Sequence, residues 1–414
     1  MSARERAEGV VGAEGLGELA TLPGVPVASP ADEAQAVELL RLAAADGLRL
    51  ALCGAGSKLG WALSAGSPDL AVSTRRLDGV VEFEPGDGVL TARAGARLAA
   101  LRDLVAAEGL ELTPDVPRPE RATLGGVVGA GQSGPDRLLH GPVRHHVLGT
   151  RSAQLSGATT RSGGRLVKNV SGYDAHRLLT GSHGCLALVL EASLRLGTAP
   201  ERRVALAREH ADLDAALEGA ASLRASGVAP RALTVENVLG AGWRVHALLA
   251  GRAAHVAREA ELASTSLGGE VEVLEGVAAA ARGDALRDLE PGGGARPALR
   301  LTAGPTRLRA ALGELFDALP SPHEALLVVQ PGVATADLEL SGGGEALGEL
   351  LPRLRAALRP LRATAQLRLP TPGEVDPLAE GDTDPARLAL QERLRATYDP
   401  RRLLTLRPPL GGLR

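Results

Sequence analysis

The apolar run LRLALC (residues 48–53) leads directly into the glycine-rich segment GAGSKLG (residues 54–60). This order predicts a buried strand that ends in a tight loop. Glycines let successive main-chain N–H groups point at one anion, as in phosphate-binding nests. The third glycine comes one place late for a dinucleotide fingerprint, and Leu59 after Lys58 does not fit a P-loop. A turn that only changes the direction of the chain is the alternative.

A second glycine-rich segment lies within residues 113–135, where regular periodicity is lost. It contains ATLGG (residues 122–126) and further glycines up to Gly134. A stretch of this length without a pattern predicts a long loop whose backbone closely approaches something else. A flexible surface loop is the alternative. Taken with residues 54–60, the segment indicates one extended ligand held mainly by main-chain groups, such as the pyrophosphate of a dinucleotide.

A third segment runs from KNVSGY (residues 168–173) through GSHG (residues 181–184) to an apolar strand. Lys168 and Lys58 are the only lysines of the chain, and both lie beside glycines. The chain otherwise uses arginine as its cation, so the two lysines suggest two places that need a compact ammonium group and not a planar guanidinium. Chance clustering and a purely structural hairpin with a short helix are the alternatives.

Composition narrows the class of protein. The 414 residues predict two or three domains. A net charge of −3 offers no basic face for nucleic acid or anionic membranes. Cys53 and Cys185 lie in apolar runs, which predicts buried, reduced thiols, a cytoplasmic location and no iron–sulfur cluster of the chain's own. Residues 1–16 lack a signal-peptide core, and no apolar run has the length of a transmembrane segment.

The order of predicted elements indicates an α+β protein. Residues 1–28 read as a loose lead-in, and a helix capped by Ser29 runs to Gly47. Strands and short helices fill the rest of a first domain, residues 29–199. Residues 200–370 twice give the order β-α-β-β-α-β, which predicts two ferredoxin-like units in tandem. Residues 371–414 form a C-terminal segment with a helix near 385–396.

The glycine-rich segments together resemble the FAD-binding PCMH-type domain of the vanillyl-alcohol-oxidase superfamily, and within it the FAD-binding subunits of bacterial glycolate oxidases. The resemblance covers about residues 30–200. It is carried by four ordered segments: LCGAGSKLGW (52–61), ERATLGGVVGAGQSGP (120–135), HGPVRHHVLGTR (140–151) and GGRLVKNVSGYDAHRLLTGSHGCLALVLEASLRL (163–196). It implies two α/β subdomains that bind FAD, followed by the ferredoxin-like units as a cap.

The resemblance also implies the residues that contact FAD. Main-chain groups of the first loop would surround the pyrophosphate, the second segment would lie along pyrophosphate and flavin, and Val147 and Val189 would face the adenine half. Many relatives attach FAD through a histidine of the first loop, so the Ser57-Lys58 found here predicts non-covalent FAD. Ala187 and Thr405 stand where relatives commonly have glycine and asparagine, which puts the neighbouring contacts in doubt. The full set is Gly54, Ala55, Gly56, Ser57, Lys58, Thr123, Gly125, Gly126, Ser133, Gly134, Val147, Gly184 and Val189.

No catalytic residue or metal ligand can be assigned from the sequence. His145-His146 is the one histidine pair of the first domain and a weak candidate for a general base. Related 2-hydroxy-acid enzymes carry a histidine-rich motif where this chain has VQPGV (residues 329–333). The expected function is therefore a flavin subunit that supports or relays electrons in a complex oxidising glycolate to glyoxylate. Its partners would be a larger flavin subunit and an iron–sulfur subunit, and they would provide any attachment to the inner membrane. A self-sufficient FAD oxidoreductase acting on a 2-hydroxy acid or polyol, and a scaffold subunit without FAD, are the alternatives.

Overall fold

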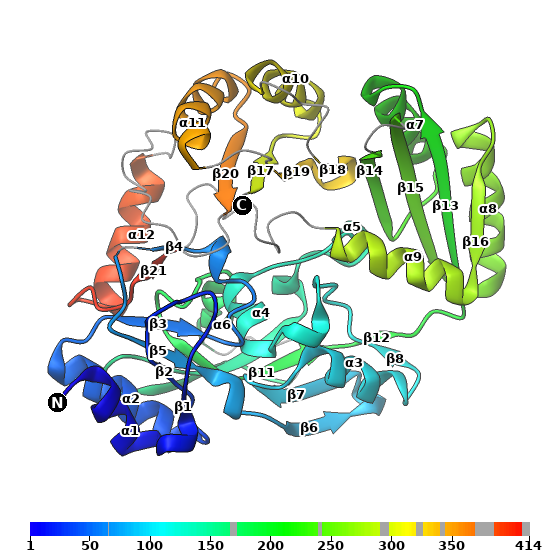
Figure 1. Ribbon diagram of the computed structural model, residues 1–414. Coiled ribbons are helices and arrows are strands. Elements are labelled where there is room, and N and C mark those ends of the chain that lie inside the picture. Colours follow the sequence, from blue (N-terminus) through cyan, green and yellow to red (C-terminus); the bar gives the residue numbers. More distant parts are fainter. Residues whose placement is uncertain are drawn as a thin grey trace. The chain divides into compact units, whose positions relative to one another are not determined.

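The computed structural model describes residues 1–64, 66–165, 172–238, 242–289, 298–319, 326–339, 344–368 and 385–407 (Figure 1). Lys168 and its neighbours up to Ser171 lie outside the described residues. The chain divides into two compact units. One comprises Met1–Gln132, Pro142–Thr198 and Thr371–Arg414, and the other comprises Ser133–Gly141 and Ala199–Pro370.

The N-terminal residues are ordered, so the prediction of a loose lead-in over residues 1–28 is wrong. Helix α1 (Ala3–Val11) begins with a capping box between Ser2 and Glu5. Ala7 and Val11, one helical turn apart, are fully buried in the core that α1 shares with α2 (Glu33–Asp46). The helical pattern here is short, because only two positions are buried and glycines lie within and after the helix.

The first sheet of this unit is mainly parallel. Its order is β1 (Leu16–Gly17), β2 (Val27–Ala28), β5 (Leu70–Ser73) and β3 (Leu50–Cys53), and the last three run parallel. Helix α2 packs on it through Leu39 and Leu40. The predicted cap at Ser29 is three residues early, because the Asp32 side chain accepts the N–H of Gln35 at 2.8 Å. Gly47 closes the helix in the left-handed conformation, as predicted.

The second sheet of this unit is antiparallel. Its order is β10 (Thr159–Gly163), β9 (Val147–Ala153), β11 (Leu188–Arg195), β7 (Val89–Arg93) and β6 (Val80–Glu84). Helices α3 (Leu98–Ala106) and α4 (Leu124–Ala130) share its core. The remaining short elements are β8 (Leu110–Glu111), which pairs with β12 (Gly197–Thr198), and α6 (Ala175–Leu179).

Helix α4 corrects the prediction of a structureless stretch over residues 113–135. Three of its seven residues are glycines, which obscure the helical pattern. Packing requires at least one of them: a Cβ on Gly125 would lie 2.6 Å from the Cβ of Ala94. Tertiary contacts therefore stabilise a helix that local propensity opposes.

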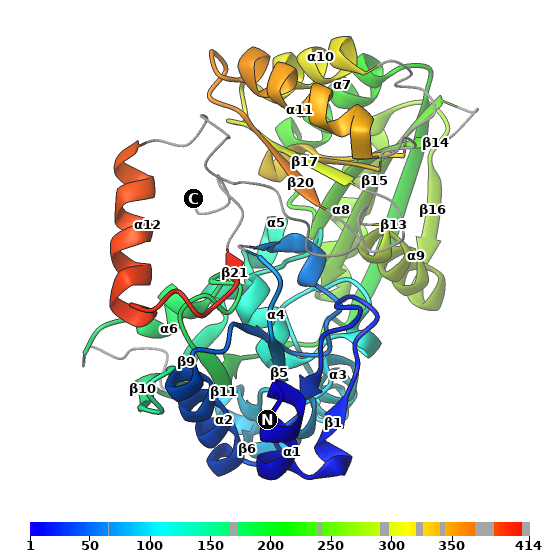
Figure 2. The same ribbon diagram turned by 60° about the vertical axis from the view of Figure 1, so that its left-hand side comes forward.

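The second unit is built on one eight-stranded sheet, in which β14 pairs with β18 and joins two halves. Each half places its strands in the order fourth, first, third, second along the chain. Helices α7, α8, α10 and α11 share one core with the sheet, and Figure 2 shows α10 and α11 against one of its faces. Helix α9 (Gly276–Asp288) packs on the other face of the first half.

The elements of the first half are β13 (Arg202–His210), α7 (Leu213–Ala225), β14 (Ala232–Val238), β15 (Gly242–Gly251), α8 (Ala253–Leu267) and β16 (Glu272–Glu275). Those of the second half are β17 (Ala298–Thr302), α10 (Leu308–Ala318), β18 (Leu327–Gln330), β19 (Thr335–Glu339), α11 (Gly344–Leu358) and β20 (Thr364–Arg368). The short helix α5 (Arg137–His140) also belongs to this unit.

The C-terminal segment belongs to the first unit. After α12 (Pro385–Tyr398), β21 (Leu406–Arg407) pairs with β4 (Leu63–Ser64) (Figure 1). The N–H and the hydroxyl of Thr405 both donate to the carbonyl of Leu50, at 2.8 and 3.1 Å. These bonds bring Leu406 beside the end of β3.

Candidate cofactor site

The loop after β3 approaches the start of α4 closely. A Cβ on Gly54 would lie 2.1 Å from the hydroxyl oxygen of Thr123 and 3.2 Å from the Cα of Gly126. The Gly54 carbonyl accepts the hydroxyl of Ser73, at 2.8 Å, so the loop is tied to the end of β5. Gly56 has φ +82°, a conformation that side chains with a Cβ disfavour. Close packing therefore explains the glycine at position 54, and backbone conformation explains the one at position 56.

Two buried hydroxyls lie where this loop meets α4. Thr123 precedes α4 and is 4% exposed, and its side chain does not cap the helix. Thr74 follows β5 and is 2% exposed. Neither hydroxyl oxygen has a hydrogen-bond partner. A buried polar group in that state costs roughly 1–3 kcal/mol, and two of them beside one glycine loop are available to a ligand bound there.

A third segment, residues 181–189, completes the wall. The N–H groups of Gly181 and His183 donate to the carbonyls of Val128 and Gly129, at 3.0 and 2.8 Å, which fixes the turn to α4. A Cβ on Gly184 would lie 2.8 Å from the carbonyl oxygen of Leu52. His183 adopts φ +53°, which is unusual for a residue with a side chain.

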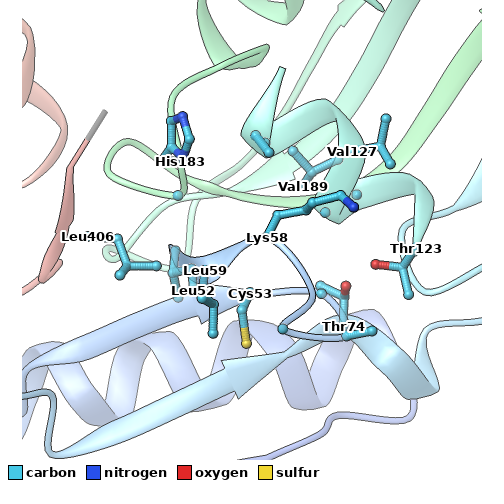
Figure 3. Close-up of a pocket in the computed structure, with 18 of the residues that line it drawn as sticks. Leu52, Cys53, Lys58, Leu59, Thr74, Thr123, Val127, His183, Val189 and Leu406 are labelled. Atoms are coloured by element: carbon cyan, nitrogen blue, oxygen red, sulfur yellow. The ribbon is translucent and has the colours of Figure 1, made fainter. Parts of the chain in front are cut away.

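Together these segments enclose a cleft of about 680 Å³, its open mouth included. Figure 3 shows Thr123 and Thr74 toward one end of the cleft, and His183 and Leu406 toward the other. Ten of the residues predicted from the sequence line it: Gly54, Ala55, Gly56, Ser57, Lys58, Thr123, Gly125, Gly126, Gly184 and Val189. Ala187, noted as a departure from the family pattern, also lies in the wall.

The structure does not bring the other three predicted residues to the wall of this cleft. Ser133 and Gly134 are grouped with the second unit. Val147 is 3% exposed in the core of the antiparallel sheet. Sequence reasoning in turn missed Thr74 and Leu406. Thr74 could have been found from the parallel pairing of β3 with β5, because neighbouring parallel strands end at the same edge of a sheet.

The lysine and the cysteine of the cleft wall each have a defined state. The ammonium of Lys58 donates to the carbonyl of Pro117, at 3.0 Å. Burial raises the pKa of the Cys53 thiol to about 12, so this wall residue is uncharged at neutral pH. His146 is buried, with its Nδ1 2.7 Å from the hydroxyl of Thr113, and neither His145 nor His146 lines the cleft. Among the described residues, no group of three or more His, Cys, Asp or Glu side chains is placed to hold a metal ion.

The observed features fit a bound dinucleotide: a glycine cradle that a Cβ would fill, and two buried hydroxyls without partners facing it. Comparison of the sequence with known families matches an FAD binding domain over residues 26–163. This range contains the loop 54–60 and the start of α4, while the wall residues between 182 and 189 and Leu406 lie outside it.

Among curated proteins, the chain is 40% identical over 132 residues to glycolate oxidase subunit GlcE of Escherichia coli (strain K12), covering 32% of this chain and 38% of that protein. It is 29% identical over 164 residues to glycolate oxidase subunit GlcD of Bacillus subtilis (strain 168), covering 40% and 35%. The chain thus spans less than half the length of either relative. A solved structure of alkyldihydroxyacetonephosphate synthase superposes with a TM-score of 0.67 at 14% identity, covering 92% of this chain and 75% of that one. That similarity concerns the fold. No helix among the described residues is long and apolar enough to cross a membrane.

Proposed function

We propose that this chain is an FAD-dependent oxidoreductase subunit that holds FAD non-covalently in the cleft. The observation that carries the proposal is the pair of partnerless hydroxyls, Thr74 and Thr123, facing the loop after β3. In this arrangement main-chain N–H groups of residues 54–58 bind the diphosphate, and the Thr123 hydroxyl donates to it. Gly125, Gly126 and Gly184 allow the cofactor to approach the backbone closely.

The remaining predicted contacts belong to the same proposal. Val189 offers main-chain groups from the wall of the cleft, and the family resemblance adds Val147, which does not line this cleft. Ser133 and Gly134 enter the proposal from the family resemblance alone. Attachment is non-covalent, since the first loop carries Ser57 and Lys58, and the Lys58 ammonium is held by the Pro117 carbonyl.

We propose that the second unit is a cap made of two ferredoxin-like halves. The support is the strand order, which in each half is fourth, first, third, second. The proposed domains are 29–199 for FAD binding, 200–370 for the cap and 371–414 for the segment that returns to the FAD domain. Bound FAD would supply a carrier of two electrons to a complex that oxidises the CH–OH group of a 2-hydroxy acid. The residues of this chain bind and orient the cofactor and exclude water from its diphosphate.

The proposed role is that of an FAD-binding subunit in a glycolate-oxidising complex with a larger flavin subunit and an iron–sulfur subunit. Similarity to two proteins named as glycolate oxidase subunits supports it. The cysteines agree with this division of labour, because an iron–sulfur cluster usually takes four thiolates. Cys53 and Cys185 are the only two, and burial raises the pKa of each to about 12. In the cap, His246 is buried with its Nε2 2.8 Å from Glu236.

Purification of the chain alone, followed by its visible spectrum and anaerobic addition of glycolate, tests this function. The expected result is a yellow protein whose flavin is released by acid and is not bleached by glycolate until partner subunits are added. Bleaching of the isolated chain would instead establish a self-sufficient oxidoreductase. A colourless protein that takes up no added FAD would contradict the proposal and leave a scaffold subunit.

A further inference from the structure

A second group of buried polar atoms lies in the C-terminal segment, outside the cofactor cleft. Arg395, on the last turn of α12, is 5% exposed. Its Nη2 donates to the carbonyl of Leu404, at 3.0 Å. Its Nε and Nη1 are buried and have no hydrogen-bond partner. A guanidinium is always charged at neutral pH, so these unsatisfied donors cost more than a neutral group would.

A second guanidinium lies near the first. Arg407 on β21 has a buried Nε without a partner, three residues beyond the carbonyl to which Arg395 donates. Burial, and then the charges of Arg407 and Arg402, lower the pKa of Arg395. Burial raises the pKa of the Cys185 thiol, and the charges of both Arg395 and Arg407 oppose this shift.

The nearest buried carboxylate is occupied elsewhere. Asp399 is fully buried, and its two oxygens accept the N–H groups of Leu403 and Leu404, each at 2.8 Å. Of the other charges, Arg402 is paired with Glu392 at the surface. Among the described charges around this point, three are guanidinium groups (Arg395, Arg402 and Arg407) and two are carboxylates (Asp399 and Glu392), and this excess of positive charge suits an anion.

We propose that Arg395 and Arg407 form a binding site for a small oxyanion, a carboxylate or a phosphate. Guanidinium N–H groups match the planar geometry of such anions. The site is distinct from the cofactor cleft, since neither arginine lines it. Leu406 does line the cleft, and because successive residues of a strand point to opposite faces, Arg407 points away from it. The proposal does not depend on the identity of the cofactor or on the reaction.

Thermal unfolding of the FAD-loaded full chain tests the site. The midpoint is measured against rising concentrations of sodium phosphate or sodium glycolate, with sodium chloride at matched ionic strength as the reference. We expect one of the two oxyanions to raise the unfolding midpoint above its value in chloride, with an effect that saturates. The oxyanion that does so shows whether the site takes a carboxylate or a phosphate. Arg395→Gln and Arg407→Gln should each weaken the fitted affinity at least tenfold. Arg393→Gln, an exposed position on the same helix, should leave it unchanged.

Two further measurements keep the proposal refutable if one glutamine variant folds poorly. Arg395→Met should be at least as stable as the natural chain in chloride alone, because it removes a buried charge, and should lose the response to oxyanions. Retention of FAD by the variants is also expected. The proposal is overturned if neither oxyanion exceeds chloride, if all variants respond alike, if Arg395→Met unfolds in chloride, or if loss of Arg395 releases FAD.

Discussion

Replacing Thr123 with valine should change the stability of the free protein and its affinity for FAD in opposite directions. Thr123 is 4% exposed, and its hydroxyl has no partner. Valine keeps the shape of the side chain and removes the unsatisfied hydroxyl, so the free energy of unfolding of the FAD-free protein should rise by about 1 kcal/mol. A hydrogen bond to a charged diphosphate is worth about 1.5–3 kcal/mol, so the Kd for FAD should rise about 10- to 150-fold.

Thr150→Val is the matched control. Thr150 is also 4% exposed with a partnerless hydroxyl, but it lies on β9 and does not line the cleft. Its valine variant should stabilise the free protein similarly and leave the Kd for FAD unchanged. Denaturant unfolding of the FAD-free proteins and fluorescence titration with FAD give the two quantities. A Thr123→Val protein that is destabilised but binds FAD normally would refute the reasoning, because the hydroxyl would then serve the fold alone.

Three further predictions use neighbouring residues. Gly54→Ala should weaken FAD binding at least tenfold in titrations, because its Cβ would lie 2.1 Å from the Thr123 hydroxyl; adding Thr123→Ala should restore the stability but not the affinity. His183→Gly should raise the free energy of unfolding by about 1 kcal/mol, since it relieves a φ of +53°, and unchanged or lower stability in denaturant would contradict this. Glu33→Gln should lower the free energy of unfolding by about 0.5 kcal/mol at pH 7, because the bidentate, partly exposed pair with Arg151 lowers the pKa of Glu33. This stabilisation is present above the unfolded pKa near 4.5 and is lost as the pH falls further. The free energies of unfolding of the two proteins should therefore become equal near pH 3.

Local patterns predict most of the secondary structure of this chain. The strand before the first glycine loop appears as β3. Helix α3 buries Leu98, Leu101 and Val105, whose spacing of three and four residues is itself a helical pattern. In the second unit, alternation and helical spacing predict each strand and helix of both halves. These elements bury apolar residues at regular intervals, so their signal is present in the sequence itself.

Elements that depend on distant contacts are harder to predict. Helix α4 is rich in glycine and forms because residues such as Gly125 pack against β7 and its flanks. Thr74 enters the site through the register of β5 with β3, which pairs Cys53 with Ser73 and so places the two following residues side by side. Leu406 lies more than 300 residues from the first loop, and its place in the cleft follows from the bonds of Thr405 to Leu50. These three features cannot be predicted from local sequence patterns.

We propose that the loop after β3 and the start of α4 hold the diphosphate of FAD. The most direct measurement is an electron-density map of the full chain after reconstitution with FAD. We predict density for the diphosphate against the main chain of residues 54–58, with an oxygen within hydrogen-bond distance of the Thr123 hydroxyl. Density for the nucleotide at another place, with this loop turned to solvent, would contradict the account.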